Sequence, residues 1–232
     1  MADNGVARLA SRRGSRWRRW LQPPRPVWEN PASRRPVIPL GRRNLYVGGA
    51  GSRVDGYINA DLFAMPGVDV ACDAERLPFR DDVFDRVDCE AVLEHTPSPR
   101  QLVSEIRRCL KPGGGCFLVA PFCHPFHEYP RDYQRFTLDG LRELVRPMEP
   151  LESGWLAGPT ATLLVFTIEY VKLWLPRRWM KQAAWVALGW TLFPLRYLDK
   201  ALVRSVDARQ LGNHGYLWAR KPASAGPADL LP

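Results

Sequence analysis

The chain has 232 residues, 46% of them hydrophobic, so it can bury one complete core, and disorder along its whole length is excluded. Its formal net charge is +9, but residues 1–43 alone hold eleven arginines and two acids, whereas residues 44–232 hold equal numbers of basic and acidic groups. The body is therefore neutral, which argues against the basic surface of a nucleic-acid-binding protein. We expect the Arg-, Pro- and Trp-rich arm at 1–43 to be irregular, either solvated or held against phosphates or anionic lipid.

Targeting and cysteine patterns favour a cytoplasmic protein. The sequence Ser11-Arg12-Arg13 looks like the start of a twin-arginine signal, but no apolar segment follows it. The five cysteines form no Cys-x-x-Cys pair and mostly lie in apolar runs, which predicts buried thiols rather than disulfides or zinc ligands.

Short apolar runs predict five strands in the first half of the chain. They lie at residues 44–48, 57–60, 68–71, 84–89 and 116–120. Between the last two, residues 99–110 have helical spacing, because Leu102, Val103 and Ile106 fall on one face. The glycines at 113–115 are expected to close that helix. Strands that alternate with a helix predict a parallel α/β sheet.

The connection between the first two predicted strands is short. Only residues 52–56 separate the glycine-rich end of the first strand from the second, whereas a crossover connection needs about a dozen residues. The first helix is therefore expected to be absent or reduced to a turn. Residues 27–40 of the arm would then close the side that it leaves open.

The second half of the chain differs in composition. Thr137 is predicted to cap a helix that runs to Val145, and residues 214–221 are typical of a last strand. Between them, residues 155–206 hold five tryptophans and long apolar stretches. The organisation that we expect is an arm at 1–43, a core at 44–154, a helical, Trp-rich insertion at 155–206, and a last strand with a tail at 207–232.

The segment 155–206 has the composition of a helix that lies in a membrane interface. Its longest nearly uninterrupted apolar run, 183–195, is too short for a bilayer, which needs about 20 residues. Seven basic residues and one acid lie between Val171 and Val206, beside Trp, Leu and Phe. A peripheral, reversible contact with an anionic membrane is one prediction. A lid over the active site or a homodimer surface is the alternative.

Four short motifs are more specific than any periodicity. They are Leu-Pro-Phe at 77–79, Phe-Asp-x-Val at 84–87, Leu-Glu-His at 93–95 and Leu-Lys-Pro-Gly-Gly at 110–114. In this order they resemble the class I S-adenosylmethionine-dependent methyltransferases, in particular the small-molecule branch of methyltransferase type 11. The resemblance covers about residues 44–146. It implies a Rossmann-like, mostly parallel sheet, S-adenosyl-L-methionine as the cofactor, and methyl transfer.

The resemblance assigns cofactor binding to loops that follow the predicted strands. The first loop contributes Gly48, Gly49 and Gly51, because a backbone without Cβ atoms lets a ligand approach. Ala50 stands where the family pattern has a glycine. Asp61 matches the acid that accepts hydrogen bonds from both ribose hydroxyls.

Further cofactor contacts are implied on the next two loops. Asp73 matches the acid beside the adenine amino group, and Ala74 would supply a backbone contact. Glu90 and Glu94 lie on the loop that passes the methionine end of the cofactor in this family.

The acceptor side is expected in the segment 121–137. Its spelling, His-x-x-Pro-x-Asp-Tyr-x-Arg-Phe-Thr, resembles a loop in one branch of these enzymes, and it follows the fifth predicted strand, where open α/β sheets place ligands. Such side chains suit substrate binding and proton removal. The candidate catalytic residues are His95, His127, Asp132, Tyr133 and Arg135. Two structural alternatives remain: an Asp132–Arg135 pair that pins the loop, and a His95 that hydrogen-bonds a loop.

A metal site is not expected. The sequence His124-x-x-His127-Glu128 would permit one, but no third ligand is evident.

Two functions remain open. One is an S-adenosylmethionine-dependent methyltransferase that acts on a small-molecule or lipid- or glycan-linked acceptor. The other is a non-catalytic, methyltransferase-like binding or scaffold protein, suggested by the imperfect glycine loop and the missing first helix. A nicotinamide dehydrogenase is disfavoured because no Gly-x-Gly-x-x-Gly is present. No specific nucleic-acid recognition is expected.

Overall fold

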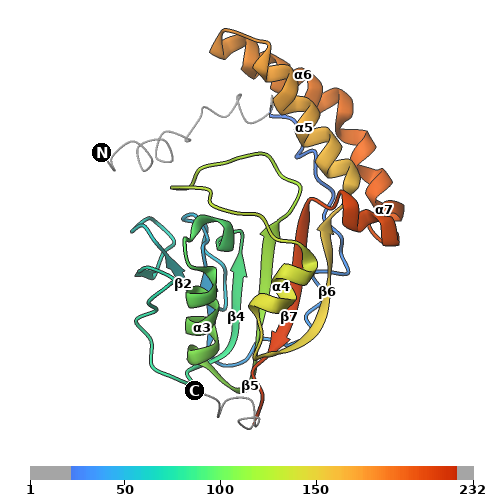
Figure 1. The fold of residues 1–232 in the computed structure, drawn as a ribbon. Coiled ribbons are helices and arrows are strands. Elements are labelled where there is room, and N and C mark those ends of the chain that lie inside the picture. Colours follow the sequence, from blue (N-terminus) through green and yellow to red (C-terminus); the bar gives the residue numbers. More distant parts are fainter. Residues whose placement is uncertain (1–21, 224–232) are drawn as a thin grey trace.

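Seven strands lie side by side in the order β3-β2-β1-β4-β5-β7-β6 (Figure 1). They are β1 (Asn44–Val47), β2 (Ile58–Asp61), β3 (Val70–Ala71), β4 (Phe84–Glu90), β5 (Leu110–Pro121), β6 (Glu149–Ala157) and β7 (His214–Arg220). Neighbouring strands from β3 to β5 are parallel, and β7 is antiparallel to both β5 and β6. The expected mostly parallel α/β sheet is thus confirmed in the computed structural model, which describes residues 22–223.

Strand β5 begins earlier than the sequence predicts. It starts at Leu110, directly after helix α3 (Pro99–Cys109), so the glycines expected between helix and strand belong to the strand. The pairing of β5 with β4 contains a register shift in this stretch, which accommodates the extra residues as a bulge. Gly115 is required there, because an added Cβ would lie 1.7 Å from Cδ1 of Ile38.

Strand β6 was not predicted at all. It pairs with β7 along its length and includes residues 155–157, so the sheet extends past the boundary expected between 154 and 155. The helical part of the segment therefore begins only after Ala157.

Helices α3 and α4 (Leu138–Leu144) cover one face of the sheet (Figure 1). Ile106 of α3 and Leu141 of α4 are fully buried in the main core, which confirms the helical stripe expected at 99–110. Thr137 caps α4, since its hydroxyl accepts a hydrogen bond from the backbone N–H of Gly140 at 3.0 Å.

The arm covers the opposite face. Phe117 of β5 and Trp218 of β7 point away from α3 and α4 and pack against Ile38. The Arg86 guanidinium lies 4.6 Å from the Trp218 ring and donates a hydrogen bond to the carbonyl of Ile38 at 2.9 Å. Asp88 neutralises this buried cation at 2.7 Å. The arm is thereby tied to the sheet by both packing and charge.

Between β1 and β2 the described chain has turns but no helix, as the short link predicts. The strand ends on this side are therefore covered by loops rather than by a helix.

Helices α5 (Pro159–Leu173) and α6 (Arg178–Leu192) pack together as a hairpin that projects beyond the sheet (Figure 1). Helix α7 (Asp199–Leu202), flanked by short 3-10 segments, leads back to β7. The carboxylate of Asp199 is fully buried and accepts hydrogen bonds from two N–H groups of the first turn of α5, at 2.8 and 3.0 Å. The start of one helix is thus capped by an acid from another.

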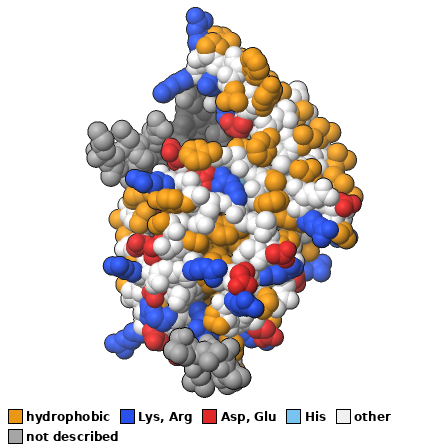
Figure 2. Space-filling model, in the orientation of Figure 1, with side chains coloured by type: hydrophobic (Ala, Val, Ile, Leu, Met, Phe, Trp, Pro, Cys, Tyr) orange, Lys and Arg blue, Asp and Glu red, His pale blue; other side chains and the backbone are white. Residues whose placement is uncertain are grey.

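The hairpin carries large apolar side chains on its surface (Figure 2). At its tip, Leu173 is 77%, Trp174 74% and Trp179 65% exposed. Arg177 and Arg178 are exposed beside them. Within residues 22–223, none of the helices has the length and apolar character needed to cross a membrane.

Candidate active site

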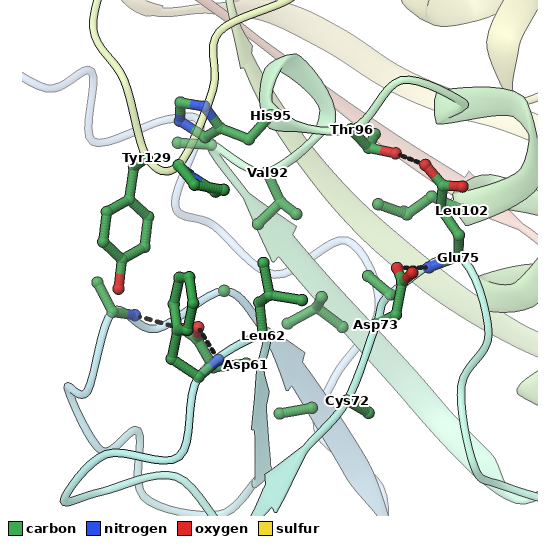
Figure 3. A pocket seen from close by; sticks show the side chains of 18 of the residues that line it. Asp61, Leu62, Cys72, Asp73, Glu75, Val92, His95, Thr96, Leu102 and Tyr129 are labelled. Atoms are coloured by element: carbon green, nitrogen blue, oxygen red, sulfur yellow. Dashed lines mark hydrogen bonds between the residues drawn. The ribbon is translucent and has the colours of Figure 1, made fainter. Parts of the chain in front are cut away.

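A cavity of about 480 Å³ opens at the carboxyl ends of β1, β2 and β4 (Figure 3). Its volume falls within the roughly 300–1,000 Å³ of small-molecule sites, and its place is where open α/β sheets bind ligands. Of the residues predicted from the sequence, those that line it are Gly48, Asp61, Asp73, Ala74, Glu90, His95, His127 and Tyr133. The predicted residues that do not line it are Gly49, Gly51, Glu94, Asp132 and Arg135.

Asp61 ends β2 and is 5% exposed. Its carboxylate accepts hydrogen bonds from the backbone N–H of Ala50 at 2.8 Å and of Phe63 at 3.3 Å (Figure 3). A carboxylate has about four acceptor positions, so two remain for a ligand. Asp61 therefore both fixes the glycine-rich loop and presents oxygens to the cavity.

The glycine-rich loop depends on left-handed backbone. Gly48 has φ +87° and Gly51 has φ +77°. An added Cβ at Gly48 would lie 2.0 Å from Cγ2 of Val92, so no side chain fits. Ala50, the departure from the family pattern, also adopts a positive φ of 47°. Ala50 thus adopts the left-handed backbone that a glycine would take more readily.

The loop after β3 is held by acids. Asp73 accepts a hydrogen bond from the N–H of Glu75 at 2.9 Å, which forms a tight turn. Glu75 in turn accepts a hydrogen bond from the hydroxyl of Thr96 (Figure 3). It also accepts one from the N–H of Ser98. Sequence reasoning missed Glu75 and Thr96, both of which line the cavity, because their pairing joins loops that are distant in the sequence.

Glu90 is shared between the cavity and the arm. Its carboxylate pairs with Arg34 at 2.6 Å, and Arg34 also contacts Glu29 at 3.1 Å. Arg34 thus brings the arm to a residue of the cavity wall, but no residue of 27–40 lines the cavity itself. Arg34 was not among the predicted site residues, because an arginine in an arm of eleven carries no distinguishing signal.

The loop after β5 roofs the cavity. The hydroxyl of Tyr129 approaches the sulfur of Met65 at 3.8 Å, and its ring meets Phe63 edge-on at 6.0 Å. His127 and Tyr133 of the same loop also face the cavity. The roof is therefore aromatic on its inner side.

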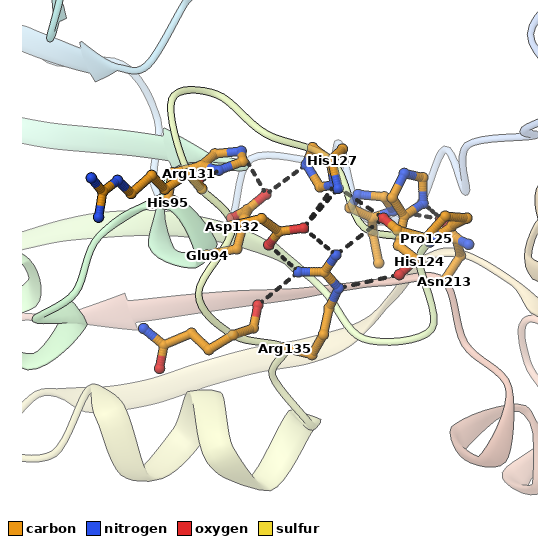
Figure 4. Close-up of polar contacts among 11 residues, drawn as sticks. Glu94, His95, His124, Pro125, His127, Arg131, Asp132, Arg135 and Asn213 are labelled. Atoms are coloured by element: carbon orange, nitrogen blue, oxygen red, sulfur yellow. Dashed lines mark hydrogen bonds and ion pairs between the residues drawn. The ribbon is translucent and has the colours of Figure 1, made fainter. Parts of the chain in front are cut away.

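Asp132 and Arg135 pin this loop. Their side chains pair through two hydrogen bonds, one of them 2.6 Å long (Figure 4). Arg135 also donates to the carbonyl of Pro125 at 3.0 Å, and Asp132 accepts from the N–H of His127 at 2.8 Å. The guanidinium lowers the pKa of Asp132 to about 2, with the N–H of His127 adding to this. Both residues act on the loop, as the structural alternative proposed.

Glu94 is fully buried next to the cavity wall (Figure 4). Its Oε1 lies 3.7 Å from Nε2 of His95 and 3.7 Å from Nε2 of His127. Among the described residues, neither carboxylate oxygen has a hydrogen-bond partner. The sequence assigned Glu94 to the cofactor, whereas its side chain lies against these two histidines.

Two further histidines form a neutral pair beside the pinned loop. His124 and His214 both face the side-chain oxygen of Asn213, at 3.1 and 2.7 Å. Burial lowers the pKa of His214 to about 3, so this ring is uncharged at neutral pH. The pair ties the start of β7 to the roof of the cavity.

The cavity offers two kinds of chemistry. Asp61 and Asp73 present acceptors suited to hydroxyl and amino groups, as a nucleoside would supply. His95, His127 and Tyr133 present flat rings with polar edges, which suit a small cyclic molecule.

Known proteins resemble this chain in sequence. The family described as a methyltransferase domain matches residues 59–118. A demethylmenaquinone methyltransferase of Renibacterium salmoninarum is 30% identical over 141 residues, which is 60% of this chain and 54% of the relative. A ubiquinone/menaquinone biosynthesis C-methyltransferase of Desulfotalea psychrophila is 40% identical over 102 residues, 42% of this chain and 41% of the relative. The chain thus spans about half the length of the curated relatives it matches.

Solved structures share the fold. The 1,6-didemethyltoxoflavin-N1-methyltransferase of Burkholderia thailandensis, with S-adenosylhomocysteine bound, has a TM-score of 0.54 at 16% identity, with 94% of this chain and 86% of that one covered. The cyclase SpnF has a TM-score of 0.52 at 20% identity, with 83% and 79% covered. One fold therefore carries proteins named for different reactions.

Proposed function

We propose that the chain is a class I S-adenosylmethionine-dependent methyltransferase that transfers a methyl group to a small-molecule acceptor, as its matching family model, its relatives and its sheet order support. The observation that carries the proposal is the cavity at the carboxyl ends of β1, β2 and β4. Its walls combine a glycine loop that excludes side chains with an acid at the end of β2, which is the arrangement a nucleoside ligand requires.

The residues present fit S-adenosylmethionine. Asp61 has acceptor positions left for the ribose hydroxyls, and Asp73 lies on the next loop beside Ala74 for the adenine. Gly48 brings backbone to the cavity wall, and a glycine is needed there because a Cβ would collide with Val92. When bound, the sulfonium supplies an already activated methyl group, so the chain has mainly to orient the acceptor in line with it and to exclude water.

For the acceptor, we propose a flat ring with an oxygen substituent. The support is the aromatic inner side of the roof and the names of the relatives, which are quinone methyltransferases. His95 and His127 lie where a hydroxyl proton could be accepted. A lipid- or glycan-linked acceptor would have to reach the same ring-binding position.

The first experiment measures binding of S-adenosylhomocysteine by calorimetry. We expect one site per chain. Absence of binding in a folded protein would favour the alternative of a methyltransferase-like scaffold without cofactor.

The second experiment measures turnover. Radiolabelled S-adenosylmethionine is offered with a demethylated naphthoquinol, a catechol and an amine of similar size. We expect label to enter the ring compounds in preference to the amine. Cofactor binding without label transfer to any ring compound would contradict the proposed acceptor class but not the cofactor site.

We also propose that the protein is cytoplasmic and that the hairpin tip contacts an anionic membrane surface. Leu173, Trp174 and Trp179 expose apolar area there, and Arg177 and Arg178 stand beside them. Tryptophan and leucine flanked by arginine suit the interface between headgroups and acyl chains, whereas a lid would have to bury these side chains against the cavity roof. The arm residues Trp17 and Trp20, which the sequence also linked to this surface, lie outside the described residues.

A further inference from the structure

Three ligand atoms converge beside the cavity. Glu94, His95 and His127 each offer one ligand atom, and these atoms all lie within 4.8 Å of one another (Figure 4). Glu94 is 0% exposed, and among the described residues both of its carboxylate oxygens lack a hydrogen-bond partner. A buried carboxylate without a partner is costly, so some positively charged group is expected to satisfy it.

The hydrogen bonds of Nδ1 in His95 and His127 determine whether Nε2 of each ring, which faces Glu94, carries a proton. Nδ1 of His95 lies 2.6 Å from the carbonyl of Arg131, and Nδ1 of His127 lies 3.2 Å from the carbonyl of Pro125. A carbonyl only accepts, so each Nδ1 carries the proton and donates it. In the neutral ring, Nε2 then has its lone pair free and turned toward the carboxylate. Glu94 raises the pKa of His127 through their contact, so a proton on Nε2 of that ring is one way to satisfy the carboxylate, and a metal ion in the same place is the other.

We propose that Glu94, His95 and His127 bind a divalent transition-metal ion. Two imidazoles and one carboxylate form the donor set of open zinc and non-haem iron sites, and each imidazole donating its second N–H to a backbone carbonyl is the usual support for such ligands. Ligands about 2.0–2.2 Å from a tetrahedral ion lie about 3.4 Å apart. The two 3.7 Å separations from Glu94 are close to this value. The third separation, between the two imidazoles, lies within 4.8 Å, so the rings would draw closer together when an ion binds.

The surroundings place and support the ion. Asp132 accepts a hydrogen bond from the backbone N–H of His127, and Arg135 in turn binds Asp132. These two contacts fix the position of His127, the proposed ligand on the loop after β5. His95 and His127 line the cavity, whereas Glu94 does not. The positions of the ion that the protein leaves free would thus face the cavity.

The use of this ion rests on the proposed function. At the cavity wall it would coordinate an oxygen of the acceptor and favour its deprotonated form, because a bound divalent ion lowers the pKa of an oxygen ligand. Binding of the metal itself does not depend on methyl transfer.

The test is metal binding by the full chain. After treatment with a chelator and dialysis, the protein is titrated with Co²⁺, whose visible absorption reports imidazole–carboxylate coordination, and with Zn²⁺ measured by elemental analysis. We expect one ion per chain, at least tenfold weaker in Glu94→Gln and in His127→Gln. His124→Gln is the matched control, since it removes a histidine of the same loop outside the cluster, and it should bind as the parent does.

Binding of S-adenosylhomocysteine to each variant shows that the fold is intact. Less than a tenth of an ion per chain, or equal affinity in Glu94→Gln and the parent, would overturn the proposal and leave protons as the charge that satisfies Glu94. Mg²⁺ bound in preference to Zn²⁺ would also contradict it, because imidazole ligands do not favour Mg²⁺. Metal binding in a protein that transfers no methyl group would uphold the site and contradict only the proposed function.

Discussion

At the scale of single residues, Asp61 and Gly48 shape the proposed cofactor half of the site by different means. Asp61 acts through charge, since its carboxylate fixes the N–H groups of Ala50 and Phe63 and keeps acceptor positions for a ligand. Gly48 acts through the absence of a side chain, since Val92 occupies the space that a Cβ would need. The two roles predict different failures on substitution.

Replacing Asp61 should weaken cofactor binding. In Asp61→Ala, the loss of a charged acceptor should cost about 1–3 kcal/mol of binding free energy, measured by calorimetry with S-adenosylhomocysteine. Asp61→Asn keeps the shape of the side chain, so its affinity for S-adenosylhomocysteine should lie between those of the parent and of Asp61→Ala. Asp55→Ala, which removes an exposed acid from the same link, is the control and should bind normally. An unchanged affinity in folded Asp61→Ala would remove this residue from the site.

Replacing Gly48 should damage both binding and stability. Gly48→Ala forces a Cβ into a left-handed position and into Val92, so Val92 must move and the loop must shift. We expect a loss of about 2–4 kcal/mol in the free energy of unfolding, measured by denaturant titration. Gly113→Ala shares the positive φ of 79° but meets nothing within 4 Å, and should cost about 1 kcal/mol. Equal losses in the two variants would show that contact with Val92 is unimportant.

At the scale of elements, the proposed acceptor side is a loop in which Asp132 pairs with Arg135. The Asp132 side chain is almost fully buried, and this pairing lowers its pKa from 3.8 to about 2. A depressed carboxyl pKa contributes stability above the unfolded value and loses it as pH falls through the folded value. The loop should therefore be held fully at pH 5–7 and released between about pH 4 and pH 2.

This pH dependence can be measured by difference. Asp132→Asn should be less stable than the parent by about 2 kcal/mol at pH 6, and the gap should narrow as the pH falls from about 4 towards 2. Thermal unfolding across this range gives the comparison. Asp139→Asn is the matched control, because it removes an exposed acid with the same spacing to Arg142, and should change stability little. A gap that stays constant down to pH 3 would contradict the assigned pKa.

The first helix of the hairpin, α5, is capped at its N-terminus by Asp199 of helix α7. Asp199 satisfies the N–H groups of Thr160 and Ala161 from a buried position. Asp199→Ala leaves these donors unpaired and should lower stability by about 1–3 kcal/mol, with faster hydrogen exchange in the first turn of α5. Asp207→Ala, an exposed acid nearby, should have no such effect. Unaltered exchange in the Asp199 variant would mean that water replaces the cap.

Local sequence predicted the elements whose signals are local. The short β1–β2 link, the α3 stripe and the Thr137 cap each depend on residues within about one helical turn or strand, and all three are present. Strand β6 was missed because Glu149–Ala157 shows no alternation of buried and exposed residues and is stabilised by pairing with β7. The same reason hid the Asp199 cap, whose acid and helix start are 38–39 residues apart.

The candidate site divides in the same way. Asp61 and Gly48 could be predicted because they match positions in the sequence motifs of the family. Arg34 and Glu75 could not, because each contacts a partner that is distant in the sequence. Glu94 was predicted as a site residue, but its neighbours depend on how the loop after β5 folds back over the η1 turn (Leu93–His95).

At the scale of the whole molecule, exposed apolar and basic side chains come together at the tip of the hairpin. The body is neutral overall, yet the tip of the hairpin joins exposed Trp174 and Trp179 with Arg177 and Arg178. A neutral body limits attraction to nucleic acid, and a local apolar and basic tip favours a flat anionic surface.

Vesicle sedimentation tests this arrangement. We expect the protein to pellet with anionic vesicles and much less with neutral ones, and to be released by high salt, because screening beyond about 8–10 Å weakens surface charge. Arg177→Gln with Arg178→Gln should weaken binding by about 2 kcal/mol. The control pair is Arg142→Gln on α4 with Arg146→Gln in the turn that follows it.

Three outcomes would decide between the alternatives for the hairpin. Equal recovery in the supernatant under all conditions favours a lid or a homodimer surface, and a concentration-dependent mass would identify the dimer. Equal weakening by the two pairs of substitutions would show that the attraction is not specific to the tip.

The two ends of the segment that carries the hairpin lie side by side at the sheet. Ala157, at the end of β6, faces His214, at the start of β7, and the N–H of Asn213 donates to the carbonyl of Ala157 at 2.9 Å. The chain thus leaves the sheet and re-enters it at one point, so everything between is topologically a single excursion. Such an excursion can lengthen, shorten or be exchanged without altering any strand order. The segment between Ala157 and Asn213, which carries the proposed membrane contact, can therefore vary in length and sequence independently of the strands. The part of the fold proposed to bind the nucleoside would stay the same.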